Sequence, residues 1–223
     1  MSINKIIQAA IAAPLLALAV SSVNAANMSE ESVYQFGSNQ SVGTSNLMRS
    51  PNGVNFSVET NGPDGGSALD GHMTTIWLVV FNEPQHCTPE GGTYGHPACS
   101  LDDVMDAMGG GENTPQIDVL YGAGSVVGNG ARAHFSGHKS VDDLNKSTFG
   151  IGLLDSKKAE VHLVVRSHGP LAAGYGETSG NVAEAIGSFI GGCGGTPWFS
   201  DLGVIPTEEG QCNDIFYSVH LPN

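Results

Sequence analysis

Short runs of β-branched and aromatic residues, separated by glycine-rich turns, most limit how this chain can fold. The clearest run, Thr74–Asn82 (TTIWLVVFN), is apolar at odd and even positions alike, which is typical of a central strand covered on both faces. Ala159–His168 (AEVHLVVRSH) and Asp214–Leu221 (DIFYSVHL) have a similar character. Because 31 of the 223 residues are glycine, long helices are disfavoured. The pattern predicts an all-β fold, an antiparallel β-sandwich with glycine-rich loops.

Weaker segments supply the remaining strands. Residues 55–59 and 149–154 are each expected to form one. Residues 117–127 and 131–138 are also strand-like, and they flank a Gly-Asn-Gly turn. An Asn-Gly pair between two such runs is typical of a tight hairpin. The sequence therefore predicts that these two strands are hydrogen-bonded neighbours.

Helical signals are confined to two segments. Residues 100–108 (SLDDVMDAM) begin with Ser100, a residue type that caps helix N-termini well, and carry aspartates in the first turn. Residues 177–190 are compatible with a second short helix, which their glycines weaken. We therefore expect one or two short helices within the β fold.

The N-terminus has the order of features of a secretory signal peptide. Lys5 precedes an apolar run, and small residues then lead to a cleavage point after Ala25. The run is too short to span a membrane comfortably, so we expect a periplasmic or secreted mature chain without a membrane anchor. The expected division is a signal peptide at 1–25, a loosely ordered segment at 26–53 and a single β-sandwich domain at 54–223.

Four cysteines follow the predicted cleavage point, and an even number in an oxidising compartment indicates two disulfides. Three pairings are possible. The most local one joins Cys87 to Cys99 and Cys193 to Cys212, so that each bridge closes a loop rich in glycine and proline. A zinc site with four thiolate ligands is the alternative.

The charge and the missing motifs narrow the function. The formal net charge is −14, with no cluster of Lys and Arg, which argues against nucleic-acid binding and against docking on an anionic membrane. The sequence contains no HExxH, no P-loop and no G-x-S-x-G motif. These absences favour a protein that is not an enzyme.

Histidine is conspicuous on the predicted strands. Alternate residues of a strand share a face, so His162, Arg166 and His168 lie on one face of their strand. His134 and His138 likewise share a face. Residues four apart on a strand are about 13 Å apart, so ligands for one metal ion must come from different strands.

Three interpretations of these side chains stay open: structural histidines, metal ligands, or a surface that binds an anion or a glycan. Imidazole suits copper and zinc. The candidate ligands for copper or zinc are His138, His162, His168 and His220. Arg166 favours a carboxylate or another anion, inside or outside the protein, because its guanidinium is a planar fork. His134 and Asn82 join Arg166 as candidates for binding a ligand.

Five segments carry a resemblance to known proteins: IWLVVFNEPQHC, ARAHFSGH, AEVHLVVRSHGP, the GGC ending at Cys193, and DIFYSVH. In this order the chain resembles a largely uncharacterised family of secreted bacterial and archaeal proteins. More distantly, it is similar to the chordin-type (CHRD) β-sandwich domains. The resemblance covers roughly residues 74–221, whereas 100–116 and 171–190 match neither group. It implies an exported β-sandwich and brings no catalytic residues.

The sequence as a whole favours an exported, disulfide-stapled, non-catalytic binding or matrix-associated module. Its partner would be a small molecule, a glycan or an extracellular protein. The alternative is a histidine-based protein or metalloenzyme that binds copper or zinc. A hydrolase of an unrecognised type is the third hypothesis.

Overall fold

The structure is a computed structural model that describes residues 27–38, 40–60, 69–88, 99–128, 132–171, 179–191, 193, 202–207 and 211–223. The strands are β1 (Met28–Gln35), β2 (Ser41–Ser50), β3 (Gly53–Thr60), β4 (His72–Phe81), β5 (Ile117–Val126), β6 (His134–Ser140), β7 (Glu160–Pro170) and β8 (Asn213–His220). The helices are α1 (Leu101–Met108) and α2 (Ser179–Ala185), and Pro84–His86 forms a 3₁₀ turn. The predicted signal peptide, 1–25, lies outside the described residues.

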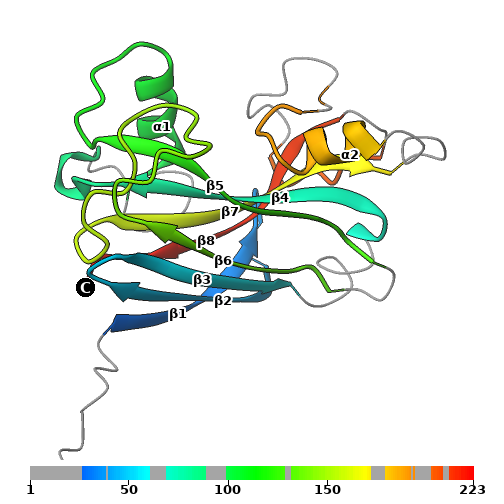
Figure 1. Cartoon of the computed structure of the whole chain (residues 1–223), viewed down its shortest axis with the longest axis horizontal. Helices are drawn as coiled ribbons and strands as arrows, with labels where there is room; N and C mark the ends of the chain where they lie inside the picture. Colours follow the sequence, from blue (N-terminus) through cyan, green and yellow to red (C-terminus); the bar gives the residue numbers. More distant parts are fainter. Residues whose placement is uncertain are drawn as a thin grey trace, which may run out of the picture.

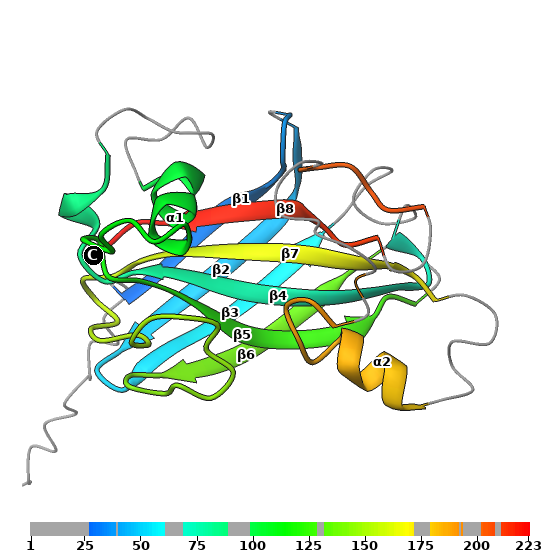
Figure 2. The same cartoon turned by 90° about the horizontal axis from the view of Figure 1, so that it is seen from above.

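All eight strands belong to one antiparallel sheet with the order β5-β4-β7-β8-β1-β2-β3-β6. The sheet folds over so that β5, β4, β7 and β8 form one layer and β1, β2, β3 and β6 form the other (Figures 1 and 2). The halves are joined where β1 pairs with β8, at Tyr34 with Tyr217 and Gln35 with Phe216. The predicted all-β antiparallel architecture is confirmed, in a nearly closed, barrel-like sheet.

The main hydrophobic core lies between the two layers. It includes Leu47 and Phe56 from one layer and Ile76, Leu78 and Leu163 from the other, and all five side chains are buried. Alternate residues of each strand point into this core, as a two-layer antiparallel fold requires. The prediction that both faces of the 74–82 strand are mostly buried is also confirmed.

The first and last strands of the sheet, β5 and β6, meet at two glycines. A Cβ atom added to Gly122 would lie 2.8 Å from Cζ of Phe56, and one added to Gly137 would lie 2.6 Å from the same atom. An added Cβ at Gly137 would also approach the carbonyl oxygen of Gly122 to 3.4 Å. The two glycines therefore leave the space in which the Phe56 ring packs and let the sheet approach closure.

The outer faces of the two layers differ. The outer face of β4, β5, β7 and β8, here called the covered face, lies under α1, α2 and their flanking loops (Figure 1). The outer face of β1, β2, β3 and β6 is here called the open face. In β2, β3 and β6 buried residues alternate with half-buried or exposed ones. Such alternation is typical of an antiparallel sheet with one solvated side.

Helix α1 begins at the residue that the sequence indicated. The Ser100 hydroxyl accepts a hydrogen bond from the Asp103 amide, and the Asp103 carboxylate accepts one from the Ser100 amide, which completes a capping box. Asp103 also accepts bonds from the amide and the hydroxyl of Thr88. The helix is thereby tied to the chain that leaves the Cys87–Cys99 disulfide.

Both predicted disulfides are confirmed, Cys87 with Cys99 and Cys193 with Cys212, and the two bridges suggest an oxidising compartment. The predicted helix within 177–190 is confirmed as α2. Neither helix in the described ranges has the length or apolarity of a membrane span.

Three expectations are corrected by the structure. Most of the segment expected to be loosely ordered, 26–53, forms β1 and β2. The hairpin prediction is wrong for the described residues, because β5 pairs with β4 and β6 pairs with β3. Residues 149–154 form no strand, since backbone groups of Gly152 and Leu154 bond to the side chains of Asn82, which follows β4, and Asp118 of β5 instead.

Candidate functional site

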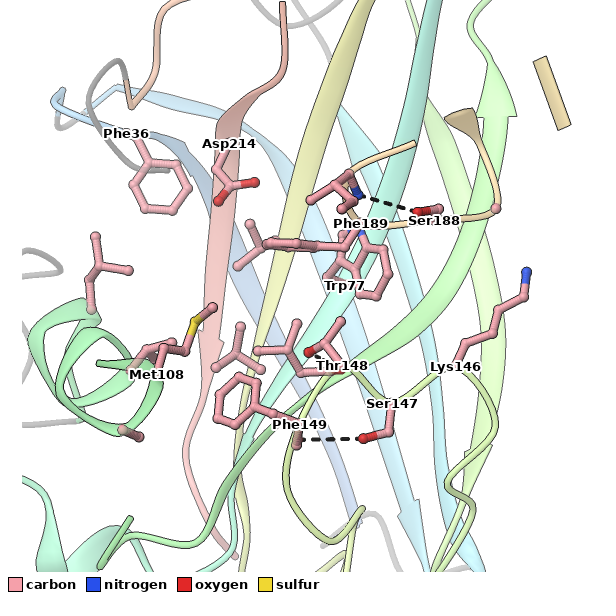
Figure 3. A pocket seen from close by; sticks show the side chains of 18 residues that line it. Phe36, Trp77, Met108, Lys146, Ser147, Thr148, Phe149, Ser188, Phe189 and Asp214 are labelled. Carbon is pink, nitrogen blue, oxygen red and sulfur yellow. Dashed lines mark hydrogen bonds between the residues drawn. The ribbon is translucent and has the colours of Figure 1, made fainter. Parts of the chain in front are cut away.

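A pocket of about 560 Å³ lies on the covered face. Its floor is made by Trp77 and Val79 of β4, with Val119 of β5 and Val164 of β7 beside them. Its walls are α1, the 146–149 loop and the 187–190 segment. Figure 3 shows the labelled aromatic and methionine side chains arranged around this hollow.

Strand alternation explains the apolar floor. Trp77 and Val79 are two residues apart on β4 and therefore point to the same side of the sheet. Val79 pairs in register with His162 of β7, and Trp77 pairs with Val164. A sheet face open to water would carry polar residues at such positions, so their apolar character requires the cover that the loops supply.

The α1 wall of the pocket is held by its own packing. Leu101 and Val104 are buried against Phe81 and Val164, in a second hydrophobic cluster on the covered face. Ala107 and Met108 follow on the same helix and line the pocket. The capping box fixes where the helix begins and so determines which side chains face the sheet.

The opposite wall, residues 186–191, is attached to the sheet by its carbonyl groups. The Tyr121 hydroxyl donates to the carbonyl oxygen of Ile186 at 2.8 Å, and Nη1 of Arg166 donates to that of Phe189 at 2.9 Å. The Phe189 ring stands edge-on to Trp77, with ring centroids 4.9 Å apart. The Arg166 guanidinium lies 3.8 Å from the centre of the same ring.

Arg166 is neutralised within the protein. Its Nε and Nη2 atoms donate to the two carboxylate oxygens of Asp214 at 2.7 and 3.1 Å, and both side chains are buried. The expectation that the guanidinium fork holds a carboxylate is therefore met by an internal partner. Asp214 lines the pocket, where this ion pair is one of its polar components.

His168 links the pocket floor to the wall. Nε1 of Trp77 donates to Oγ1 of Thr75 at 2.8 Å, so that hydroxyl donates onward to Nε2 of His168 at 3.0 Å. Nδ1 of His168 then carries the proton and donates to the carbonyl oxygen of Gly191 at 2.9 Å. Burial, and secondarily Arg166, lower the pKa of His168 to about 4, so the imidazole is neutral near pH 7.

The four candidate metal ligands do not meet. His162 and His168 share the covered face as predicted, but His162 bonds to Glu160 at 2.6 Å. His220 points to the interior, where Ser29 contacts its Nδ1 at 2.7 Å and Ser45 its Nε2 at 2.9 Å. Burial, and then Arg49, lower the pKa of His220 to about 3. These three histidines therefore have separate polar partners.

His138 lies on β6, several strands away from β7 in the sheet order. It is exposed on the open face, with Nδ1 3.0 Å from Oδ1 of Asn55 and Nε2 3.2 Å from Oγ of Ser140. A site shared between the β6 and β7 histidines is therefore wrong. His134 is exposed on the same strand and also lies away from the pocket.

Asn82 braces the 152–154 segment, which precedes β7, and does not line the pocket. Its amide nitrogen donates to the carbonyl oxygens of Gln116 and Gly152, and its amide oxygen accepts from the Leu154 amide. Both donors of the side chain are thus used internally. This accounting supports a structural role for Asn82.

The sequence analysis missed the pocket residues. Two-sided apolar character in the 74–82 strand was the available signal, because it required a cover outside the sheet. Which segments supply that cover depends on contacts between distant parts of the chain, such as Phe189 with Trp77.

Comparison with family models, curated proteins and solved structures finds no match. The resemblance to the family of secreted bacterial and archaeal proteins and to chordin-type domains therefore stays a prediction. The case for a function is made by the pocket geometry.

Proposed function

We propose that the protein is an exported, non-catalytic binding protein that takes a small apolar molecule into the pocket of the covered face. The observation that carries this proposal is a hollow of about 560 Å³ floored by Trp77, Val79 and Val164. This volume is within the range of about 300–1,000 Å³ that small-molecule sites occupy. Apolar lining with a few polar groups is also usual for such sites.

The lining favours a ligand with a ring or a branched aliphatic body. Phe36, Trp77, Phe149 and Phe189 bring four aromatic side chains to one pocket, and aromatic edges pack well against flat or bulky apolar groups. The polar components include the Asp214 carboxylate, the Lys146 ammonium group and the hydroxyls of the 147–148 and 188 positions. They favour a ligand whose apolar body carries a small polar group at its end.

A binding role is also supported by the state of the lining acid. Asp214 is held by two hydrogen bonds from Arg166, so a general-base role would first require that ion pair to open. Export is supported by the two disulfides together with the signal-peptide features of the first 25 residues. Both observations favour a stable extracellular or periplasmic receptor for its ligand.

The test is a binding titration with the neutral fluorescent probe N-phenyl-1-naphthylamine, on the chain that begins at residue 26. We expect saturable binding at one site. Replacing Ala107 by Trp fills the pocket from α1 and should weaken binding at least about tenfold, or 1.4 kcal/mol. Thr44→Trp, on the open face, is the matched control and should leave the affinity unchanged. Equal affinity in the two variants, or no saturable binding, would overturn the proposal.

A further inference from the structure

Three potential metal ligands converge where the pocket wall joins β7 and β8. Nδ1 of His168 lies 3.5 Å from Sγ of Cys212 and 3.8 Å from Sγ of Cys193. All three atoms lie within 4.8 Å of one another. Because the two sulfurs are bonded to each other, they are not available as ligands in this oxidised form.

The nitrogen–sulfur distances already suit a shared ion. Zinc binds histidine nitrogen at about 2.0–2.1 Å and thiolate sulfur at about 2.3 Å, which at tetrahedral to trigonal angles separates the two donors by about 3.6–3.8 Å. The distances from His168 to Cys212 and Cys193 are 3.5 and 3.8 Å. Because these nitrogen–sulfur distances already match, the imidazole needs no movement to bind an ion. Only the two sulfurs have to separate, once the bond between them is broken.

We infer that reduction of Cys193–Cys212 creates a site for a thiophilic d¹⁰ ion, Zn(II) or Cu(I), bound by His168 and the two cysteines. Soft thiolates with imidazole are the donor set that both ions prefer. The inference is independent of ligand binding in the pocket, since it concerns the anchor of the wall and not the hollow.

The chemistry balances with a dithiol as reductant. A dithiol transfers two electrons and two protons to the disulfide, becomes a disulfide itself, and leaves two cysteine thiols. The incoming ion displaces one proton from each thiol, and both protons pass to solvent. His168 stays neutral, because its proton moves from Nδ1 to Nε2 when Nδ1 binds the ion.

The surroundings can hold that second tautomer. Nε2 of His168 is 3.0 Å from Oγ1 of Thr75, which can accept the Nε2 proton. Metal-bound histidines commonly donate their other ring proton to such a partner, which fixes the orientation of the ring. The carbonyl oxygen of Gly191, 2.9 Å from Nδ1, loses its donor and becomes a candidate fourth ligand for zinc.

Access and charge also favour the site. His168 and Cys212 are buried, whereas Cys193 is half-buried and offers a path for the reductant and the ion. Arg166 lies two residues before His168 on the same face of β7. Asp214 pairs with Arg166, so the fixed charge beside the ion is balanced.

The test uses the whole mature chain after reduction with a phosphine. Zinc binding is tested by titration with Co(II), a spectroscopic probe for zinc sites. Copper binding is tested by titration with Cu(I) in competition with a chromogenic chelator. We expect one ion per chain and a thiolate-to-cobalt charge-transfer band, both absent from the oxidised protein. The Cys87→Ala/Cys99→Ala variant should keep the site, and Cys193→Ala/Cys212→Ala should lose it. Binding by the oxidised protein with the same affinity would overturn the inference.

Two single variants test the role of the imidazole. His168→Ala should weaken binding at least about 100-fold, whereas His138→Ala, a histidine on the open face, should leave it unchanged. An unchanged affinity in His168→Ala would overturn the assigned ligand set. Reduction can also unfold the chain. Circular dichroism of the reduced chain, with and without the ion, tests for this. Recovery of the native spectrum on adding the ion supports the site, and failure to recover it contradicts the site.

Discussion

The covered face and the open face belong to one sheet, yet the strands beneath them differ in pattern. Along β7 ten of the eleven residues are buried, whereas in β6 buried and more exposed positions alternate. The covered face has α1, both disulfides and the pocket, while the open face presents side chains such as Thr44 and His138 to solvent. The pocket thus forms where the strands of the sheet are buried on both faces, by the core on one face and by the helices and loops on the other.

The difference is also one of electrostatics. On the covered face, Arg166 and Asp214 form a buried ion pair with side chains 1% and 4% exposed. On the open side, Arg132 and Glu59 form a pair with side chains 69% and 37% exposed. A guanidinium–carboxylate pair therefore occurs once in a buried and once in a solvent-exposed environment within one protein. The comparison predicts a graded series of effects.

The largest effect is expected in the floor of the pocket. Trp77→Ala should lower the free energy of unfolding by about 3–5 kcal/mol, because the buried indole leaves a cavity and loses its contact with Phe189. Met48→Ala on the open face should change it by no more than about 0.5 kcal/mol. Urea denaturation measures both. A loss below about 1 kcal/mol for Trp77→Ala would show that the two faces do not differ as described.

The ion pairs give the second contrast. Arg166→Gln should cost about 3–5 kcal/mol, because it leaves the Asp214 carboxylate buried without its cation. Arg132→Gln should cost about 1 kcal/mol or less, since water solvates Glu59 in its place. Chemical denaturation of each single variant and of each double variant with its acid gives the two coupling energies. Similar coupling energies for the two pairs would break the comparison.

The disulfides come next. Replacing Cys193 and Cys212 by Ala should lower the free energy of unfolding by about 2–5 kcal/mol and weaken probe binding, because the bridge anchors the 186–191 wall. Replacing Cys87 and Cys99 should have a stability effect in the same range. Thermal unfolding and probe titration measure the two consequences separately. An unchanged probe affinity in the first variant would show that the wall is positioned without its anchor.

The last contrast is a dependence on pH, which builds up gradually over the titration range. The pKa of His168 is about 4 in the folded chain, below its ordinary value of 6.5, so the unfolded chain binds the extra proton between these values. Stability contributed by the neutral imidazole is therefore present above pH 6.5 and falls by up to about 1.4 kcal/mol per pH unit toward pH 4. His168→Gln should reduce the slope of unfolding free energy against pH in this window, while His220, whose pKa is also lowered, continues to contribute. A slope that is unchanged in His168→Gln would contradict this prediction.

Local patterns in the sequence predicted the elements that depend on residues close together in the chain. The 74–82 strand is apolar on both parities, and Ser100 with Asp103 forms the cap that begins α1. The two disulfides followed from the short intervals between cysteines. Each of these features depends on neighbours in the sequence, so sequence reasoning could reach them.

Strand β2 shows why other elements were missed. Its inward positions include Ser45, Leu47 and Arg49, so the apolar alternation that marks a strand is interrupted. The polar side chains are satisfied by distant partners, since Ser45 contacts His220 and Arg49 donates to the carbonyl oxygens of Ala159 and His220. A buried polar cluster of this kind is recognisable only once the strands are assembled.

Prediction of the candidate site failed for the same reason, because the site depends on which distant strands are neighbours in the sheet. Strand parity placed His162, Arg166 and His168 on one face correctly, but it could not determine which strands were neighbours. The order of the sheet separates His138 from them, and the register of β8 against β7 places His220 on the core side. The cluster of His168 with Cys193 and Cys212 joins residues that no spacing rule connects.

The pairing of β1 with β8 determines when the molecule can fold. Tyr34 in the first described strand lies opposite Tyr217 in the last described strand, so the two layers are joined only after β8 has been synthesised. Contacts of such long range slow folding, because the entropy of closing a large loop is lost before the contacts form. The chain must remain without its complete sheet until residues 213–220 have been made.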